Sequence, residues 1–181
     1  LGCGGRDSTG VPEKHGFDVF FGYYDQVHAH SFYTPYLIRN SEEVVLEGNV
    51  GGRTGKTYSE YPIHAAALQF IRENKERPFL CYMPITPPHG MYDIPADDPA
   101  WELYKNEAWM RDPTISQDTK NYAAMVSMVD REVGNVLDLL HDLGLEENTI
   151  VFFTGDNGGQ DRFKSKEHPR GFFGPNVNPE N

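Results

Sequence analysis

The residue types best suited to chemistry stand near the end of the chain, in the group Asp156-Asn157-Gly158-Gly159. A carboxylate and an amide carbonyl side by side are hard oxygen ligands of the kind that Ca²⁺ and Mg²⁺ prefer. The glycines allow the backbone to turn sharply and to approach a ligand closely. The same residue types are common in ordinary turns, so the local sequence indicates either a metal site at Asp156 and Asn157 or a turn.

His89 is the second candidate, because it directly follows Pro87-Pro88 and a run of apolar residues. The two prolines restrict the backbone, which would hold the imidazole in a fixed place. An imidazole held in this way can donate a hydrogen bond to an oxyanion or act as a general acid. The alternative is a surface histidine in a loop, and the local sequence leaves both interpretations open.

Two further groups carry side chains that suit a binding site. His28 and His30 are two residues apart, which would place both on one face of a strand, and no third or fourth zinc ligand lies at a convincing spacing. A packing or substrate-pocket role is therefore favoured over a metal-binding role. The segment from Arg162 to Arg170 is a concentrated basic stretch in an acidic chain. It would either line the pocket of an anionic substrate or form a solvated loop.

Two predicted strands would position His89 and Asp156. Phe79 to Met83 and Thr149 to Thr154 are apolar runs without polar alternation, which is typical of strands buried on both faces. A helix between two strands favours a parallel pair in one sheet. Because ligands collect beyond the carboxyl ends of parallel strands, we expect both residues on the same rim of the sheet.

Helices are predicted where apolar residues recur every three or four positions, from Ser59 or Tyr61 to Asn74 and from about Asp118 to Leu143. The proline-rich excursion from Pro84 to Asp112 is too long for an ordinary connection, which indicates a functional loop or a lid. The segment from Val27 to Arg53 is predicted to be irregular, apart from a short strand at Glu43 to Leu46.

Composition excludes several classes of protein. The chain has 181 residues, enough for one domain with a core, and a formal net charge of −11. Nucleic acid is therefore not an expected partner, since binding its phosphates needs a basic surface. No apolar run approaches the ~20 residues of a membrane span. The two cysteines are too few for a disulfide scaffold.

Taken in order along the chain, these segments resemble the sulfatase family, which has the alkaline-phosphatase-like fold. The resemblance rests on Gly16-Phe17-Asp18 with the following Phe21-Gly22-Tyr23, on Pro78 to His89, and on Asp130 to Gly134 followed by Leu145 to Gly158. It implies an α/β fold with a mostly parallel central sheet flanked by helices. Residues 1–181 would then form an incomplete catalytic domain that is truncated at both ends.

The resemblance also implies hydrolysis of a sulfate ester in a sulfated small molecule or glycan. Asp156 and Asn157 would ligate Ca²⁺, and His89 would contact the sulfate group as a catalytic and substrate-binding residue. The family's nucleophile is a formylglycine made from the Cys or Ser of a Cys/Ser-x-Pro-x-Arg motif. Neither Cys3 nor Cys81 stands in such a motif, so the formylglycine is expected outside this chain, and the chain alone is expected to be inactive.

Two rival functions fit the same residues. One is a phosphate- or phosphonate-ester hydrolase of the same superfamily, because phosphate and sulfate are similar in shape. The other is a non-catalytic binding protein that has kept the pocket without the chemistry. The family resemblance favours a periplasmic, secreted or lysosomal location, and the sequence leaves the oligomeric state open.

Overall fold

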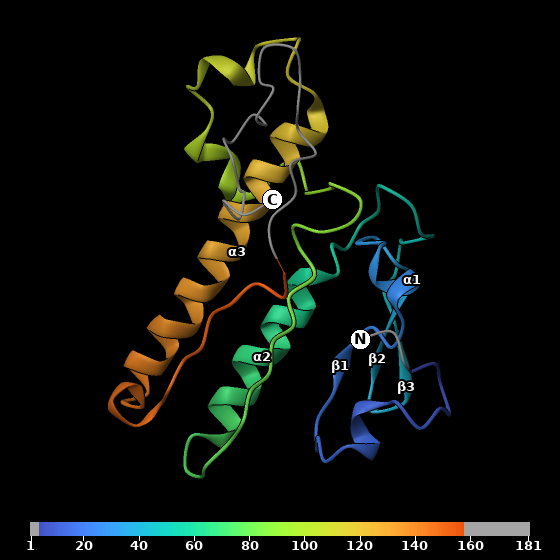
Figure 1. The fold of residues 1–181 in the computed structure, drawn as a ribbon, viewed down its shortest axis with the longest axis vertical. Coiled ribbons are helices and arrows are strands. Elements are labelled where there is room, and N and C mark those ends of the chain that lie inside the picture. Colours follow the sequence, from blue (N-terminus) through green and yellow to red (C-terminus); the bar gives the residue numbers. More distant parts are fainter. Residues whose placement is uncertain (1–3, 158–181) are drawn as a thin grey trace.

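The computed structural model describes residues 4–157 of the chain (Figure 1). The small sheet packs on one side of helix α2, and helix α3 packs on the other side. No helix in this range is long and apolar enough to cross a membrane. In chain order the elements are η1 (Pro12–Lys14), β1 (Phe21–Gly22), α1 (Gln26–Ala29), β2 (Tyr36–Arg39), β3 (Glu42–Val45), α2 (Glu60–Asn74), η2 (Pro99–Leu103), η3 (Ala108–Met110), α3 (Gln117–Asp142) and η4 (Glu146–Asn148).

The three strands form an antiparallel sheet in the order β1-β2-β3. Asn40 and Ser41 make the two-residue turn between β2 and β3, with φ angles of 45° and 73°. A turn with two positive φ angles matches the twist of a β-hairpin. The strand expected at Glu43 to Leu46 is confirmed as β3, whereas the prediction that residues 27–53 are otherwise irregular was wrong at α1 and β2.

Both predicted long helices are confirmed as α2 and α3. Ser116 caps the N-terminus of α3, where its hydroxyl oxygen accepts a hydrogen bond from the backbone N–H of Thr119. Gly144 follows the end of α3 with a φ of 67°, a left-handed conformation that glycine adopts without strain.

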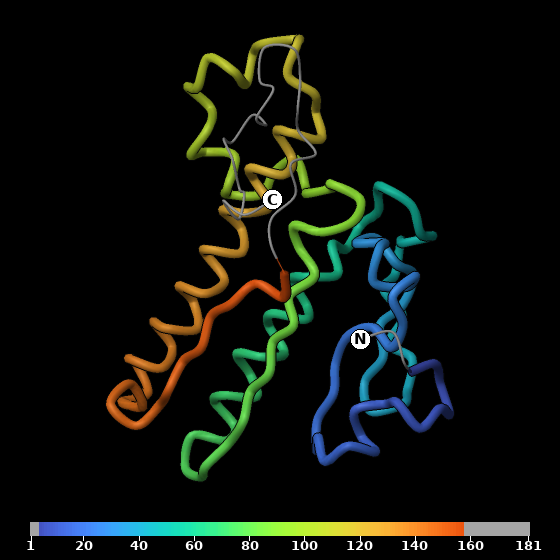
Figure 2. Tube along the Cα trace, in the orientation of Figure 1, coloured from blue at the N-terminus to red at the C-terminus, as the bar shows by residue number. Residues whose placement is uncertain are grey.

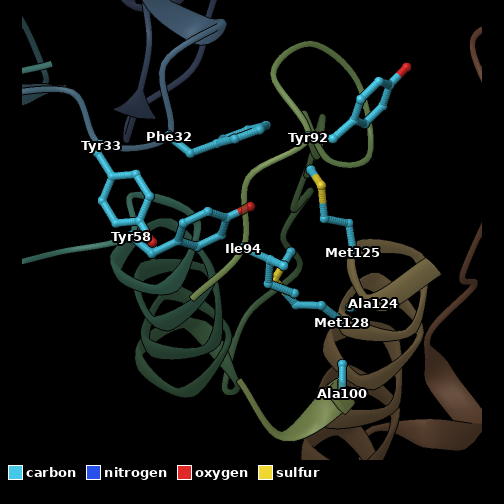
Figure 3. Close-up of a cluster of buried hydrophobic side chains, with 9 residues drawn as sticks. All are labelled: Phe32, Tyr33, Tyr58, Tyr92, Ile94, Ala100, Ala124, Met125 and Met128. Carbon is cyan, nitrogen blue, oxygen red and sulfur yellow. The ribbon is translucent and has the colours of Figure 1, made fainter. Parts of the chain in front are cut away.

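The largest apolar cluster joins α3 to segments that are distant in sequence (Figure 3). Met125 and Met128 of α3 have no exposed surface and pack with Ile94 of the excursion and Phe32 of the segment after α1. The cluster therefore holds the end of α1, the start of α2 and the excursion in fixed relative positions. Its buried members are Phe32, Tyr33, Tyr58, Tyr92, Ile94, Ala100, Ala124, Met125 and Met128.

The segment 79–83 was predicted to be a strand buried on both faces, and it forms no strand in the described residues. Phe79 and Cys81 pack against an apolar cluster between α2 and α3, but Leu80 and Tyr82 are 76% and 65% exposed. One face of the segment is covered and the other is open, so the prediction of double burial was wrong. The buried members of that cluster are Ile71, Leu139 and Leu140.

The segment 149–154 also forms no strand in the part of the chain that the structure describes. Its side chains Ile150, Phe152 and Phe153 are 81%, 87% and 74% exposed. Figure 2 shows both segments running along the helices without joining the sheet. A strand needs a neighbour whose backbone groups complete its hydrogen bonds, and an apolar pattern does not say which segment supplies that neighbour. The predicted parallel pair of these two segments is therefore absent from residues 4–157.

Hydrogen bonds connect the excursion from Pro84 to Asp112 to both long helices. The carboxylate of Asp98 has no exposed side-chain surface and accepts two hydrogen bonds from Arg131 of α3, both 2.8 Å long. It also accepts a hydrogen bond from Tyr61 of α2. Burial works against the charge of Asp98, but the hydrogen bonds from Arg131 and Tyr61 outweigh burial and hold its pKa below the ordinary value.

Two acidic side chains are buried between α2 and α3. Glu60 and Glu132 are 2% and 3% exposed, and Glu132 Oε2 has no hydrogen-bond partner among the described residues. Burial raises the pKa of Glu60 to about 7. Burial, together with the nearby Glu60 carboxyl, raises the pKa of Glu132 to about 9.

These raised pKa values predict that stability falls as the pH rises from about 5 towards 9, because the folded state keeps protons that the unfolded chain releases. We expect Glu132→Gln to remove part of this fall, and so to raise the free energy of unfolding more at pH 8 than at pH 5. Urea unfolding at both values measures the effect, with the exposed Glu147→Gln as the matched control. An equal change at the two pH values would contradict the buried-carboxyl account.

Candidate active site

His89 lies in a closed turn at the start of the excursion. Its backbone N–H donates a 3.0 Å hydrogen bond to the carbonyl oxygen of Thr86, across a Pro87–Pro88 bond that is cis. Gly90 follows with a φ of 89°, which few other residues adopt. The imidazole of His89 is exposed. The turn therefore presents a histidine at the surface in a defined backbone position.

His30 lies beside His89. It is the C-cap of the short helix α1, and its Nε2 lies 3.2 Å from Nε2 of His89. The two ring centroids are 5.2 Å apart. A Cβ atom added at Gly90 would lie 3.1 Å from Cδ2 of His30, so the absence of a side chain at position 90 gives the ring its room.

The ring of His28 lies against Thr34 and Tyr36. Its Nε2 lies 2.7 Å from the Thr34 hydroxyl oxygen and 2.8 Å from the Tyr36 carbonyl oxygen, and its ring packs on Tyr36. The prediction that His28 and His30 share one face of a strand was wrong. Asp25 caps a helical turn there by accepting from the backbone N–H of His28, and this cap was a signal that sequence analysis missed.

Arg53 ties together the segments around His89. Its Nε donates a 2.7 Å hydrogen bond to Asp93, and its Nη2 donates a 3.0 Å hydrogen bond to Asp118 at the start of α3. The hydroxyl of Ser31, next to His30, donates to the carbonyl oxygen of Gly52 in the same loop. Sequence analysis missed Arg53, because its partners are distant in sequence and leave no local pattern.

Asp93 is the buried partner of Arg53. Its side chain is 7% exposed, and its Oδ2 has no hydrogen-bond partner among residues 4–157. Burial raises the pKa of Asp93, and the hydrogen bond from Arg53 works in the opposite direction. Arg53 therefore offsets part of the cost of burying the Asp93 carboxylate.

Asp156 and Asn157 lie at the end of the described range, and both are exposed. Their oxygens suit a hard divalent cation in chemistry, but two ligands are only part of the six to eight that Ca²⁺ takes. No group of three or more His, Cys, Asp and Glu side chains within residues 4–157 is arranged to hold a metal ion. The basic stretch from Arg162 to Arg170 lies outside the described residues.

A hollow of about 460 Å³ lies elsewhere on the molecule. Tyr33, Tyr61, Lys56 and Asp97 are among the residues that line it, whereas the two facing histidines are not. The histidine pair and the Asp156-Asn157 group, whose side chains suit chemistry, are not among the residues that line this hollow.

Comparisons with known proteins agree with one another. A family model described as Sulfatase matches residues 3–171. The chain is similar to the uncharacterized sulfatase YdeN of Escherichia coli (strain K12), with 29% identity over 175 residues that cover 91% of this chain and 28% of that protein. It is also similar to the N-acetylgalactosamine-6-sulfatase of Canis lupus familiaris, with 29% identity over 162 residues that cover 81% of this chain and 27% of that protein.

A shorter similarity exists to the Endo-4-O-sulfatase of Bacteroides thetaiotaomicron, with 32% identity over 99 residues that cover 49% of this chain and 19% of that protein. The chain therefore spans less than a third of the length of each of these three relatives.

The ion pairs of Arg53 with Asp93 and Asp118 lead to a prediction about the stability of the fold. Arg53→Met should lower the free energy of unfolding by about 1–3 kcal/mol at pH 7, because it leaves the buried Asp93 carboxylate without its partner. The loss should be smaller at pH 4, because burial raises the pKa of Asp93 and a protonated carboxyl loses less when Arg53 is removed. Denaturant unfolding at both pH values measures this, with the exposed Arg72→Met of α2 as the matched control. A loss no larger than that of the control would show that the ion pairs of Arg53 do not stabilise the fold.

Proposed function

The chain belongs to the sulfatase family, and from that premise we propose that the protein containing it hydrolyses sulfate esters at a site that includes His89, Asp156 and Asn157. The observation that carries the proposal is the family match over residues 3–171, a range that includes all three residues. The name of one relative, N-acetylgalactosamine-6-sulfatase, contains a sugar, which supports a sulfated small molecule or glycan as the substrate class.

In the complete fold, the segments 79–83 and 149–154 would join a mostly parallel central sheet of the alkaline-phosphatase-like type. Their exposed apolar side chains support this placement, since burying a Phe, Leu or Ile side chain contributes about 1.5–3 kcal/mol. The open faces of Leu80 and Phe152 are where further strands would pack. Such a sheet would bring the turn of His89 and the group at Asp156 to one rim.

Asp156 and Asn157 would supply two oxygen ligands to Ca²⁺. Both lie exposed at the end of an apolar segment, so ligands from other parts of the protein can reach the same ion. A bound Ca²⁺ would neutralise negative charge on the sulfuryl oxygens. Asp156 contributes the negative charge of this pair, and Asn157 contributes a neutral carbonyl oxygen.

His89 would donate a hydrogen bond to an oxygen of the sulfate ester. Its exposure and its position in a closed turn support this role, because the ring is accessible while its backbone is fixed. The nucleophile would be a formylglycine outside this chain, since no Cys or Ser of residues 1–181 stands in a Cys/Ser-x-Pro-x-Arg motif.

The reaction class is tested by turnover of chromogenic sulfate and phosphate esters by the complete protein. We expect sulfate-ester hydrolysis with calcium bound and much slower phosphate-ester hydrolysis. Preference for the phosphate ester would favour a phosphatase of the same superfamily, and no turnover of either ester would favour a binding protein.

Asp156→Ala in the complete protein should abolish both calcium retention and sulfate-ester hydrolysis, and Asp156→Asn should weaken both by removing one negative charge. Metal analysis of the purified variants beside wild type measures retention, with the exposed Asp142→Ala as the control. Stoichiometric calcium retained by Asp156→Ala would contradict the assignment of Asp156 as a calcium ligand.

His89→Ala should lower kcat by about 10²–10³, the usual loss when one donor to developing negative charge is removed. The melting temperature should hardly change, because the His89 side chain is exposed. Steady-state kinetics and thermal unfolding measure both, with the exposed His141→Ala of α3 as the control. Near-normal kcat at an unchanged melting temperature would remove His89 from the site.

A further inference from the structure

We infer that His30 is a positioning residue for His89: it accepts the Nε2 proton of His89 and thereby sets the tautomer and direction of that imidazole. Nothing in the sequence pattern pairs the two residues, which are 59 positions apart. The inference rests on the proposed function in one respect, because it takes His89 as the residue that meets the substrate.

One backbone contact indicates which ring nitrogens of His30 and His89 carry protons. Nδ1 of His30 lies 2.5 Å from the carbonyl oxygen of Gln26, and a carbonyl oxygen can only accept a hydrogen bond. Nδ1 of His30 therefore carries a proton, and when the ring is neutral its Nε2 carries a lone pair. That lone pair faces Nε2 of His89 at 3.2 Å, so His89 must carry its own proton on Nε2 to complete the hydrogen bond.

Local backbone structure holds His30 in place. The backbone N–H of His30 donates to the carbonyl oxygen of Val27, which closes the last turn of α1. Gly90 leaves the space that the His30 ring occupies, and any side chain there would crowd the ring at 3.1 Å in a backbone conformation that favours glycine. Both ends of the contact are thus fixed by backbone hydrogen bonds.

The direction of the proton matters for an anionic substrate. With the Nε2–H tautomer, the single Nε2–H of His89 points at His30 in the free protein, and a sulfate-ester oxygen that enters beside the two rings would replace His30 Nε2 as its acceptor. The opposite tautomer would present a lone pair to a negatively charged oxygen, which is repulsive. His30 therefore favours the form of His89 that can stabilise negative charge.

Two substitutions in the complete enzyme separate positioning from packing. His30→Gln keeps an amide oxygen that can accept the His89 proton, whereas His30→Leu keeps bulk and loses the acceptor. We expect His30→Leu to lose about 10- to 100-fold in kcat with little change in KM, the loss typical of removing a partner that orients a functional histidine. His30→Gln should recover most of this loss, and the control His141→Leu should lose nothing.

Histidine-selective ¹⁵N NMR at pH 8 reads the tautomer directly and does not depend on activity. We expect His89 in the Nε2–H form in wild type and in His30→Gln, and a mixture of tautomers in His30→Leu. An unchanged His89 tautomer in His30→Leu would overturn the inference, even if His89→Ala abolishes turnover. Equal losses in both His30 variants with lowered melting temperatures would also overturn it, because they would show a packing role. If wild type shows no sulfate-ester turnover, the proposed function fails, and the tautomer alone decides the role of His30.

Discussion

The ion pair between the buried Asp98 and the half-buried Arg131 is the interaction on which the arrangement of this chain depends. Moving a carboxylate out of water costs several kcal/mol unless its partners match it closely. Here two parallel hydrogen bonds of 2.8 Å and a third from Tyr61 supply that match. The pair locks the excursion onto α2 and α3, and the same excursion begins with the turn of His89. The ion pair therefore helps to hold the segment that carries His89 against the two long helices.

The ion pairs of Arg53 and a shared apolar core also hold the segments around His89 in place. Arg53 joins the loop after β3 to Asp93 and to the start of α3, and the aromatic and methionine cluster of Figure 3 holds the same segments from inside. The result is that α1 and the His89 turn meet, although they are far apart in sequence. The groups proposed for catalysis lie at the surface, whereas Asp93 and Asp98, the acidic partners of the two arginines, are buried.

Sequence reasoning worked where a local pattern carries the information. Helices α2 and α3 follow from the spacing of apolar residues. It failed where a distant partner decides the outcome. The segments 79–83 and 149–154 are apolar enough for a sheet, but their composition does not name their neighbours, and residues 4–157 contain none. The pairing of His30 with His89 has the same character, because only the folded chain brings the rings together.

We have proposed that His89 and the Asp156-Asn157 group serve one site, and a crystal structure of the complete protein with calcium and sulfate would decide this. We expect one calcium ion with oxygens of Asp156 and Asn157 at about 2.3–2.6 Å. We also expect a sulfate oxygen on that ion within about 2.7–3.2 Å of Nε2 of His89. Calcium bound without Asp156, or sulfate bound on the ion but out of reach of His89, would contradict the proposal.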